Sequence, residues 1–291
     1  MRKGWSGQFA SLICLCFLSI QVAADTPVWK VSKSGKYLYV AGTIHILNET
    51  DYPLPIQFNK AYDDSDSIFI EVDIDRLAEP RVRKRIFEQS TYPEGKSLKD
   101  EISRDTLMEL SRYCSLRNLS LRELIRYRPG AVASILTSVE YSRLALNGTG
   151  VDMHYLMRAR KDKKPVGYLD SVQTQFQLSM DLNQGNPDEV IRYSLSTVFS
   201  AAEHLGRIKT AWREGDLKAM EELSVAPMQQ YSPDTYQSIL AERNLDWIPK
   251  IEKMLRDDRV EFVLFGAAHL VGEHGVLPLL EQKGYRIERF Y

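Results

Sequence analysis

Two short segments of this chain share one order of residue types, and both end in a residue that can bind a metal or carry a proton. In each, an apolar run leads into a glycine and a histidine follows three positions later: Gly42 with His45, and Gly266 with His269. A glycine at a strand end permits a close backbone approach, so the chain can turn and present the histidine at the edge of a sheet. One Gly-x-x-His is most often only a loop, but two in matching contexts, among 5 histidines in the chain, indicate a shared site.

Glu71 is a third candidate because it interrupts an apolar run. In one interpretation it lies on a half-exposed strand, where alternation puts Phe69, Glu71 and Asp73 on one face toward water. In the other it lies at the carboxyl end of the strand beside the two histidines, where it ligates a metal or accepts a proton. Two imidazoles and one carboxylate form a common ligand set for a catalytic divalent ion, here Mn, Co or Zn, with a position open for water.

Arg243 lies three residues after Leu240 and four before Trp247, which places it on the apolar stripe of a predicted helix. A charge there is costly unless it is paired. The arginine either reaches solvent or a core acid, or it directs its guanidinium at a substrate carboxylate or a developing oxyanion.

The segments that must position these residues are strand-like at both ends of the chain and helical in the middle. Short β-prone runs cover residues 28–31, 37–40, 68–72, 262–265 and 286–290, with helices near 55–62 and 276–283. Helical spacing dominates from about 97 to 256, with one interior strand at 165–169 and a helix N-cap at Asp170 and Ser171. This predicts an α/β (α+β) fold, in which a mixed central sheet built from both chain ends carries a large helical insertion lobe.

Composition excludes several classes of protein. The chain has 291 residues, 44% of them hydrophobic, which is enough for a buried core and unlike a disordered or low-complexity chain. Lysine and arginine number 38 against 39 aspartates and glutamates, so no strong field favours nucleic acid. We therefore expect no nucleic-acid partner, and the sequence leaves the oligomeric state open.

The first 24 residues have the pattern of a secretory signal. Arg2 and Lys3 precede an apolar stretch from Phe9 to Ile20, and Val22 and Ala24 fill the small-residue positions of a cleavage site before Asp25. The apolar stretch is 12 residues long, shorter than the ~20 that a bilayer span needs. We expect an exported protein, periplasmic or secreted, that begins at Asp25 and has no stable membrane insertion afterwards.

Disulfides are not expected to stabilise the exported chain. Two of its three cysteines lie in the predicted signal, so Cys114 alone remains and cannot form an internal disulfide.

Taken together, the order and spacing of the motifs resemble those of the TraB/PrgY/GumN family, which also takes in the Tiki-type membrane proteases. The resemblance covers nearly the whole of residues 25–291, which it implies form a single domain. It rests on these segments: 42–45, 71–73, Gly150-Val151-Asp152, Leu169-Asp170-Ser171 with Gln175, 212–216, Arg243-Asn244, and 266–272.

The resemblance also implies roles for some of these residues. The paired motifs are regarded as metal-dependent protease motifs in the Tiki branch, which implies that His45 and His269 bind metal together with Glu71. It further suggests that Asp170 and Gln175, with Gly42 and Gly266, contact substrate.

Two functions are therefore expected. The first is an exported metal-dependent hydrolase of peptides or a related acyl substrate, in which His45, His269 and Glu71 hold the ion, Glu71 is the general base if it is not a ligand, and Arg243 stabilises the tetrahedral intermediate. The second is a non-catalytic periplasmic or secreted protein that binds a peptide or small ligand. The first requires both imidazoles in one cleft, within about 10 Å of each other.

Overall fold

The computed structural model describes residues 26–144, 146, 148–181 and 185–291. The predicted signal segment, residues 1–24, lies outside them. Within the described residues, no helix is long and apolar enough to cross a bilayer.

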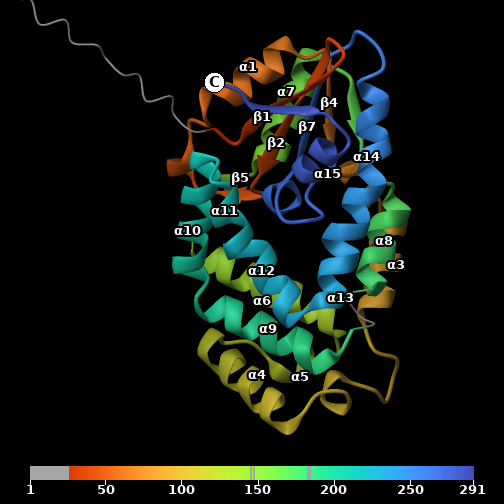
Figure 1. The fold of residues 1–291 in the computed structure, drawn as a ribbon. Helices are drawn as coiled ribbons and strands as arrows, with labels where there is room; N and C mark the ends of the chain where they lie inside the picture. Colours follow the sequence, from red (N-terminus) through yellow and green to blue (C-terminus); the bar gives the residue numbers. More distant parts are fainter. Residues whose placement is uncertain (1–25, 145, 147, 182–184) are drawn as a thin grey trace, which may run out of the picture.

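A six-stranded mixed sheet forms the upper part of the molecule in Figure 1, with strand order β6-β4-β7-β2-β1-β8. Its strands are β1 (Val28–Lys33), β2 (Lys36–Thr43), β4 (Ser67–Ile70), β6 (Val166–Tyr168), β7 (Glu261–Gly266) and β8 (Arg286–Arg289). β6, β4, β7 and β2 run parallel to one another, and β1 is antiparallel to both β2 and β8. The predicted sheet from both chain ends is confirmed.

The first hairpin shows how the local sequence sets the sheet. Lys33 pairs with Lys36 across a two-residue loop in which Ser34 and Gly35 have φ values of 52° and 83°. Positive φ at both loop residues is the turn geometry that matches strand twist. The hairpin therefore fixes the register of β2, whose last residues lead into His45.

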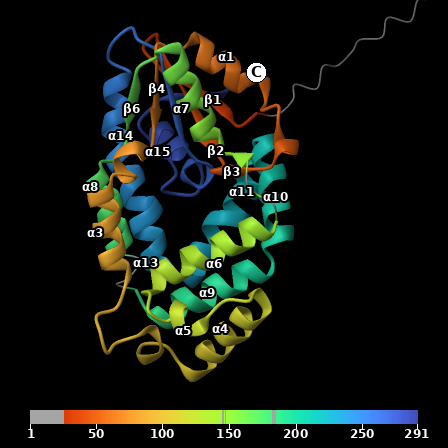
Figure 2. The same cartoon turned by 180° about the vertical axis from the view of Figure 1, so that it is seen from behind.

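Helices cover both faces of the sheet. They are α1 (Ile56–Asp64) and α7 (Val151–Asp162), which face the viewer in Figure 2, and α14 (Glu242–Met254) and α15 (Val276–Gln282) on the other side. Phe58 of α1 and Tyr155 of α7 pack against Phe262 of β7, whereas Trp247 of α14 packs against Phe265 three residues later. Because side chains three apart on a strand point to opposite faces, β7 is buried between the two helix layers.

The remaining helices form a lobe below the carboxyl ends of the parallel strands (Figures 1 and 2). They are α2 (Ile74–Leu77), α3 (Pro80–Ser90), α4 (Arg104–Arg117), α5 (Leu121–Leu124), α6 (Pro129–Arg143), α8 (Val172–Asp181), α9 (Pro187–Phe199), α10 (Ala201–Glu214), α11 (Leu217–Met220), α12 (Ala226–Tyr231) and α13 (Pro233–Tyr236). The lobe has a second apolar core that includes Leu110, Leu136 and Ile191. The chain leaves the sheet twice to build it, because β6 returns to the sheet between α7 and α8.

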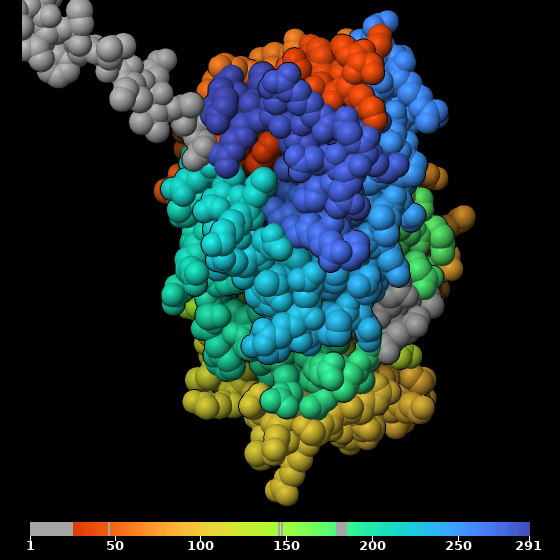
Figure 3. Space-filling view, viewed as in Figure 1, coloured from red at the N-terminus to blue at the C-terminus, as the bar shows by residue number. Residues whose placement is uncertain are grey.

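Two π-turns interrupt the helices where the lobe meets the sheet, at Glu221–Val225 and Gln237–Ala241. A π-turn adds one residue to a helical turn and so rotates the side chains that follow it by about 100°. In the space-filling view of Figure 3, the segments of the C-terminal half lie against one another. Side chains therefore fill much of the space that the ribbons of Figure 1 leave open on this side of the molecule.

Candidate functional site

Three neighbouring parallel strands, β4, β7 and β2, end at one edge of the sheet, and a candidate residue follows each end. Glu71 comes directly after β4, His45 two residues after β2, and His269 lies in a 3-10 turn after β7, Ala267–Leu270. Glu71 is thus not on a half-exposed strand, because β4 ends at Ile70 and the carboxylate is 14% exposed. This topology explains why two histidines 224 positions apart meet.

Gly266 marks the centre of this group. Glu71 Oε1, His45 Nε2 and His269 Cδ2 lie 3.4, 3.5 and 3.7 Å from the position that a Cβ atom would take on this glycine. The two imidazoles therefore face one small space, well within the expected 10 Å. The backbone N–H of Gly266 also donates to Glu71 Oε1 at 2.7 Å.

Gly42 has a packing role at the end of β2. A Cβ atom on it would lie 2.5 Å from Leu270 Cδ1 and 3.1 Å from Ala267 Cα, so only glycine lets the two Gly-x-x-His segments approach this closely. Its carbonyl accepts a hydrogen bond from Trp212 Nε1 at 2.7 Å. Substrate contact by Gly42 stays a prediction.

His45 is hydrogen-bonded to the protein through Nδ1, while most of its side chain is exposed. Its Nδ1 lies 2.8 Å from Asp152 Oδ2, and Thr43 donates to the other oxygen of Asp152 at 2.7 Å. The carbonyl of His45 packs against Gly150, where a Cβ atom would lie 2.0 Å from it. The side chain is 64% exposed, and the hydrogen bond with Asp152 raises the pKa of His45 to about 9.

His269 is buried and neutral. Burial lowers its pKa to about 3, with Arg243 and His45 acting in the same direction. Its Nδ1 lies 2.6 Å from Asn244 Oδ1 and its Nε2 lies 3.2 Å from Arg243 Nη1. Because the guanidinium can only donate, we assign the proton to Nδ1 and the lone pair to Nε2. The ring stacks on Trp247 with centroids 4.5 Å apart.

Arg243 connects the cluster to α14. Its Nη2 donates to Glu71, its Nε donates to Asp170 Oδ2 at 2.9 Å, and its Nη1 donates to the carbonyl of Ile239 at 3.1 Å. Burial acts to raise the pKa of Glu71, but the positive charges of Arg243 and His45 and the hydrogen bond from the Gly266 N–H hold it below its usual range. The interpretation that Arg243 pairs with a core acid is correct, and the acids are Glu71 and Asp170.

Asp170 lies behind this arginine. Its Oδ1 accepts from Trp247 Nε1 at 2.6 Å and its Oδ2 accepts from Gln175 at 3.2 Å. Ser171 caps α8 in its place, with its Oγ accepting from the N–H of Thr174 at 3.0 Å. Neither Asp170 nor Gln175 is among the residues that line the adjacent cavity, and their contact with substrate stays a prediction.

A cavity of about 380 Å³ opens beside the cluster. It is lined by residues of the cluster, namely His45, Glu71, Gly266, His269 and Arg243, and by residues of the helical lobe. Both imidazoles and Glu71 therefore line one cleft, and Arg243 reaches it from α14, which covers the sheet, rather than from the lobe.

The residues fit a divalent ion in type but are not arranged around one. His45 directs its Nε2 toward Glu71, and His269 directs its Nε2 toward Arg243. The Nδ1 of each ring bonds to an oxygen, of Asp152 for His45 and of Asn244 for His269, which is how metal-binding histidines are oriented. Among the described residues, however, no group of three or more His, Cys, Asp or Glu is close enough to hold an ion. Arg243 takes up contacts of Glu71 and His269 that an ion would make.

Sequence reasoning did not assign roles to Asp152 and Asn244, which orient the two histidines. Both lie in motifs that carried the resemblance, Gly150-Val151-Asp152 and Arg243-Asn244. A polar side chain at a buried position of a predicted helix was the signal that could have identified both residues.

The sequence is similar to those of several known proteins. The chain is 23% identical over 247 residues to the uncharacterized protein YbaP of Escherichia coli (strain K12), which covers 84% of this chain and 87% of that protein. It is 24% identical over 306 residues to the metalloprotease TIKI2 of Xenopus tropicalis, covering 86% of this chain and 57% of that protein. The corresponding match to TIKI2 of Danio rerio is 24% over 319 residues, covering 90% and 60%. No solved structure matches the chain. The family model described as TraB/PrgY/gumN matches residues 27–289, and the chain belongs to this family.

Proposed function

We propose that this protein is an exported metal-dependent hydrolase that acts on peptides or a related acyl substrate. The observation that carries the proposal is the convergence of His45, His269 and Glu71 on the space in front of Gly266, at the open end of three parallel strands. Ligands of open α/β sheets bind at such carboxyl edges. Relatives named metalloproteases support the reaction class.

In this proposal His45, His269 and Glu71 hold the divalent ion. When bound, the ion lowers the pKa of a coordinated water and polarises the carbonyl that is attacked. Asp152 and Asn244 fix the orientation of the two imidazoles, and Gly266 fixes one oxygen of Glu71. If Glu71 does not ligate, it is the base that accepts the proton of the attacking water.

Arg243 has a positioning role in this proposal. Its Nε, Nη1 and Nη2 atoms all donate to protein groups, and two carboxylates balance its charge. It would have to give up one of these partners to stabilise an oxyanion. We therefore assign it the task of holding Glu71 and His269 in place.

The test is metal-dependent cleavage. The protein is stripped with a chelator, reloaded with Mn, Co or Zn, and offered a peptide library. Cleavage is expected only with metal, and not in His45→Ala or His269→Ala. The control is His204→Ala, because His204 lies on α10 and is not among the residues that line the cavity. Cleavage without metal, or no cleavage with any of the three ions, contradicts the proposal.

Export is tested separately. Protein recovered from the periplasm or the medium of an expressing bacterium should begin at Asp25, and its intact mass shows this directly. Exported protein that keeps residues 1–24 contradicts the cleavage.

A second candidate is a binding protein without turnover. One observation favours it: the cluster is internally satisfied, with Arg243 already paired to Glu71 and Asp170. Peptide retention that survives His45→Ala, with no product formed by the wild type, would support this function over hydrolysis.

A further inference from the structure

Apart from the cluster, the lining of the cavity is mostly apolar. Six of its apolar side chains, here called the apolar wall, come from the helical lobe and the segments that join it to the sheet: Tyr141, Leu146, Leu205, Ile208, Met228 and Ile239. They come from α6, α10, α12, the second π-turn and the segment after α6. At about 380 Å³ the cavity is at the small end of ligand pockets, so it suits a short segment of substrate rather than a folded domain.

The charges on this wall are neutralised within the protein. Among the described residues that line the cavity, the lobe contributes one charged side chain, Lys209, and its Nζ lies 2.5 Å from Asp51 Oδ2. Ser224 Oγ donates to the carbonyl of Met220. A charged substrate group placed against this wall would lose its water without gaining a partner, which is costly.

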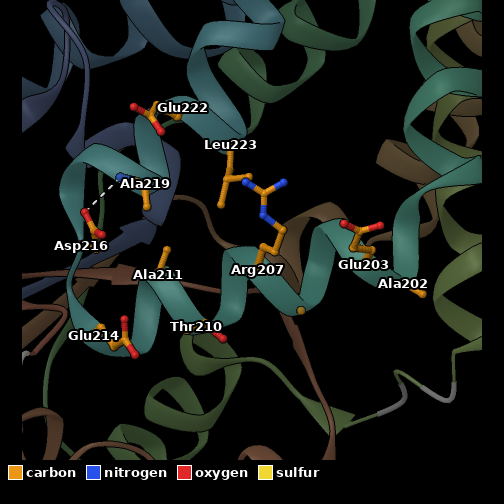
Figure 4. Close-up of a pocket in the computed structure, with 11 residues that line it drawn as sticks. Ala202, Glu203, Arg207, Thr210, Ala211, Glu214, Asp216, Ala219, Glu222 and Leu223 are labelled. Carbon is orange, nitrogen blue, oxygen red and sulfur yellow. Dashed lines mark hydrogen bonds between the residues drawn. The ribbon is translucent and has the colours of Figure 1, made fainter.

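Helix α10 shows that the apolar wall is confined to the cavity. Leu205 and Ile208 line it, whereas the other face of the helix carries Glu203, Arg207 and Thr210 toward an acidic groove (Figure 4). Ile208 is only partly buried at the edge of the sheet core. The apolar stripe of α10 therefore continues past the packed core into open space beside the cluster.

We propose that this wall is a specificity pocket that takes an apolar side chain of a peptide substrate next to the bond that is cleaved. This rests on the proposed function. Two of the lining residues, Met220 and Met228, are methionines, whose side chains adapt to ligands of different shapes. The pocket therefore accepts leucine, methionine and phenylalanine and rejects aspartate and lysine.

Capped peptides of the form acetyl-Ala-Ala-Xaa-Ala-Ala-amide test the pocket, with Xaa as Leu, Met, Phe, Asp or Lys. With metal-loaded protein, kcat/KM for Leu, Met and Phe should exceed that for Asp and Lys by about 10-fold to 100-fold. Ile208→Glu should lower kcat/KM for the Leu peptide about 10-fold and raise it for the Lys peptide. Thr210→Glu, which adds the same charge to the exposed face of the same helix, should leave both unchanged.

Met228→Gln is a second variant that keeps side-chain size, in case Ile208→Glu does not fold. It should also lower kcat/KM for the Leu peptide relative to the Lys peptide. Equal cleavage of Leu and Asp peptides by the wild type, or no change in Ile208→Glu and Met228→Gln, overturns the proposal.

Calorimetric binding to His45→Ala separates this inference from the proposed function. Tighter binding of the Leu peptide than of the Asp and Lys peptides, without cleavage by the wild type, supports the pocket and contradicts the hydrolase. Metal-dependent cleavage without any preference for Xaa supports the hydrolase and overturns the pocket. If the protein hydrolyses an octanoyl ester but binds no peptide, the wall accommodates an acyl chain and the peptide proposal is overturned. Binding of neither the ester nor any peptide also overturns it.

Discussion

Two buried carboxylates, Glu140 in the lobe and Glu71 at the sheet edge, are both paired with arginine, yet they differ in what else they face. Glu140 is fully buried, and its oxygens accept from Tyr113 at 2.9 Å, Arg117 at 2.5 Å and Arg143 at 2.8 Å. Glu71 has Arg243 and the N–H of Gly266, and it also lines a cavity.

The difference shows that pairing alone does not mark a site. At Glu140 every partner is a donor from the lobe helices α4 and α6, so the cluster ties these helices together. Glu71 instead shares its cavity with two imidazoles, and the exposed one, His45, can exchange a proton or a ligand with solvent. We therefore expect changes at Glu71 to affect activity and changes at Glu140 to affect stability.

The largest effect is expected for Glu71→Gln. Loss of the negative charge removes a metal ligand or base, and kcat should fall about 1,000-fold, in the range for loss of a general base. Arg243 keeps Asp170 as partner, so the fold should persist. Cleavage of the Leu peptide by metal-loaded protein measures this. Glu140→Gln is the matched control, and comparable loss of activity in its folded fraction would erase the distinction between the two clusters.

For Glu140→Gln we expect a loss of stability. Breaking a buried ion pair commonly costs 3 to 5 kcal/mol, and because Arg143 can reach solvent the loss here should be about 3 kcal/mol. Burial acts to raise the pKa of Glu140, but hydrogen bonds from Arg117, Arg143 and Tyr113 bring it below the ordinary value. Its stabilisation is thus present above the unfolded pKa and is lost as pH falls through the folded pKa.

Urea unfolding of wild type and Glu140→Gln at pH 7 and at pH 3 measures both effects. The difference in free energy of unfolding should be larger at pH 7. A variant as stable as the wild type at pH 7 would contradict a structural role for the lobe cluster.

Glu261 extends the comparison to a buried carboxylate with incomplete pairing. It lies at the start of β7 and is 2% exposed, and within the described part of the chain its Oε2 has no hydrogen-bond partner. Burial, aided by Asp257, raises its pKa to about 7. For an acid with a raised folded pKa, stability falls as pH rises from the unfolded value toward the folded one.

Glu261→Gln should therefore gain roughly 2 to 3 kcal/mol in free energy of unfolding at pH 8 and little at pH 4. Urea unfolding at both values measures this, with Glu288→Gln on the edge strand β8 as the control. An equal effect of Glu261→Gln at pH 4 and pH 8 would show that the pKa of Glu261 is not raised.

Sequence patterns predicted the site residues that follow strands better than they predicted the contacts of Arg243. His45, His269 and Glu71 follow apolar strands, and parallel strands bring their carboxyl ends to one edge, so their meeting follows from topology. The partners of Arg243 did not follow, because Glu71 and Asp170 lie 172 and 73 positions away in the chain, and a helical pattern does not say which acids a buried arginine meets.

The lobe illustrates a different limit. Helical spacing predicted its helices after residue 97, but neither α2 and α3, which precede the predicted range, nor the ion cluster inside its core. Arg117 and Glu140 are 23 positions apart, and which polar residues of two helices meet depends on how the helices cross rather than on either pattern.

The smallest effect is expected behind the site, at Asp152. Its Oδ2 lies 2.8 Å from His45 Nδ1, and carboxylates in this position typically raise metal affinity 10-fold to 100-fold. Asp152→Asn keeps the size of the side chain but not the charge, so the metal concentration for half-maximal activity should rise by about that factor while activity at saturating metal recovers. Asp162→Asn, at the far end of α7 where Asp162 accepts from Tyr62, is the control. A metal titration separates the two roles: a purely structural Asp152 would lower activity at every metal concentration, whereas one that orients His45 shifts only the midpoint.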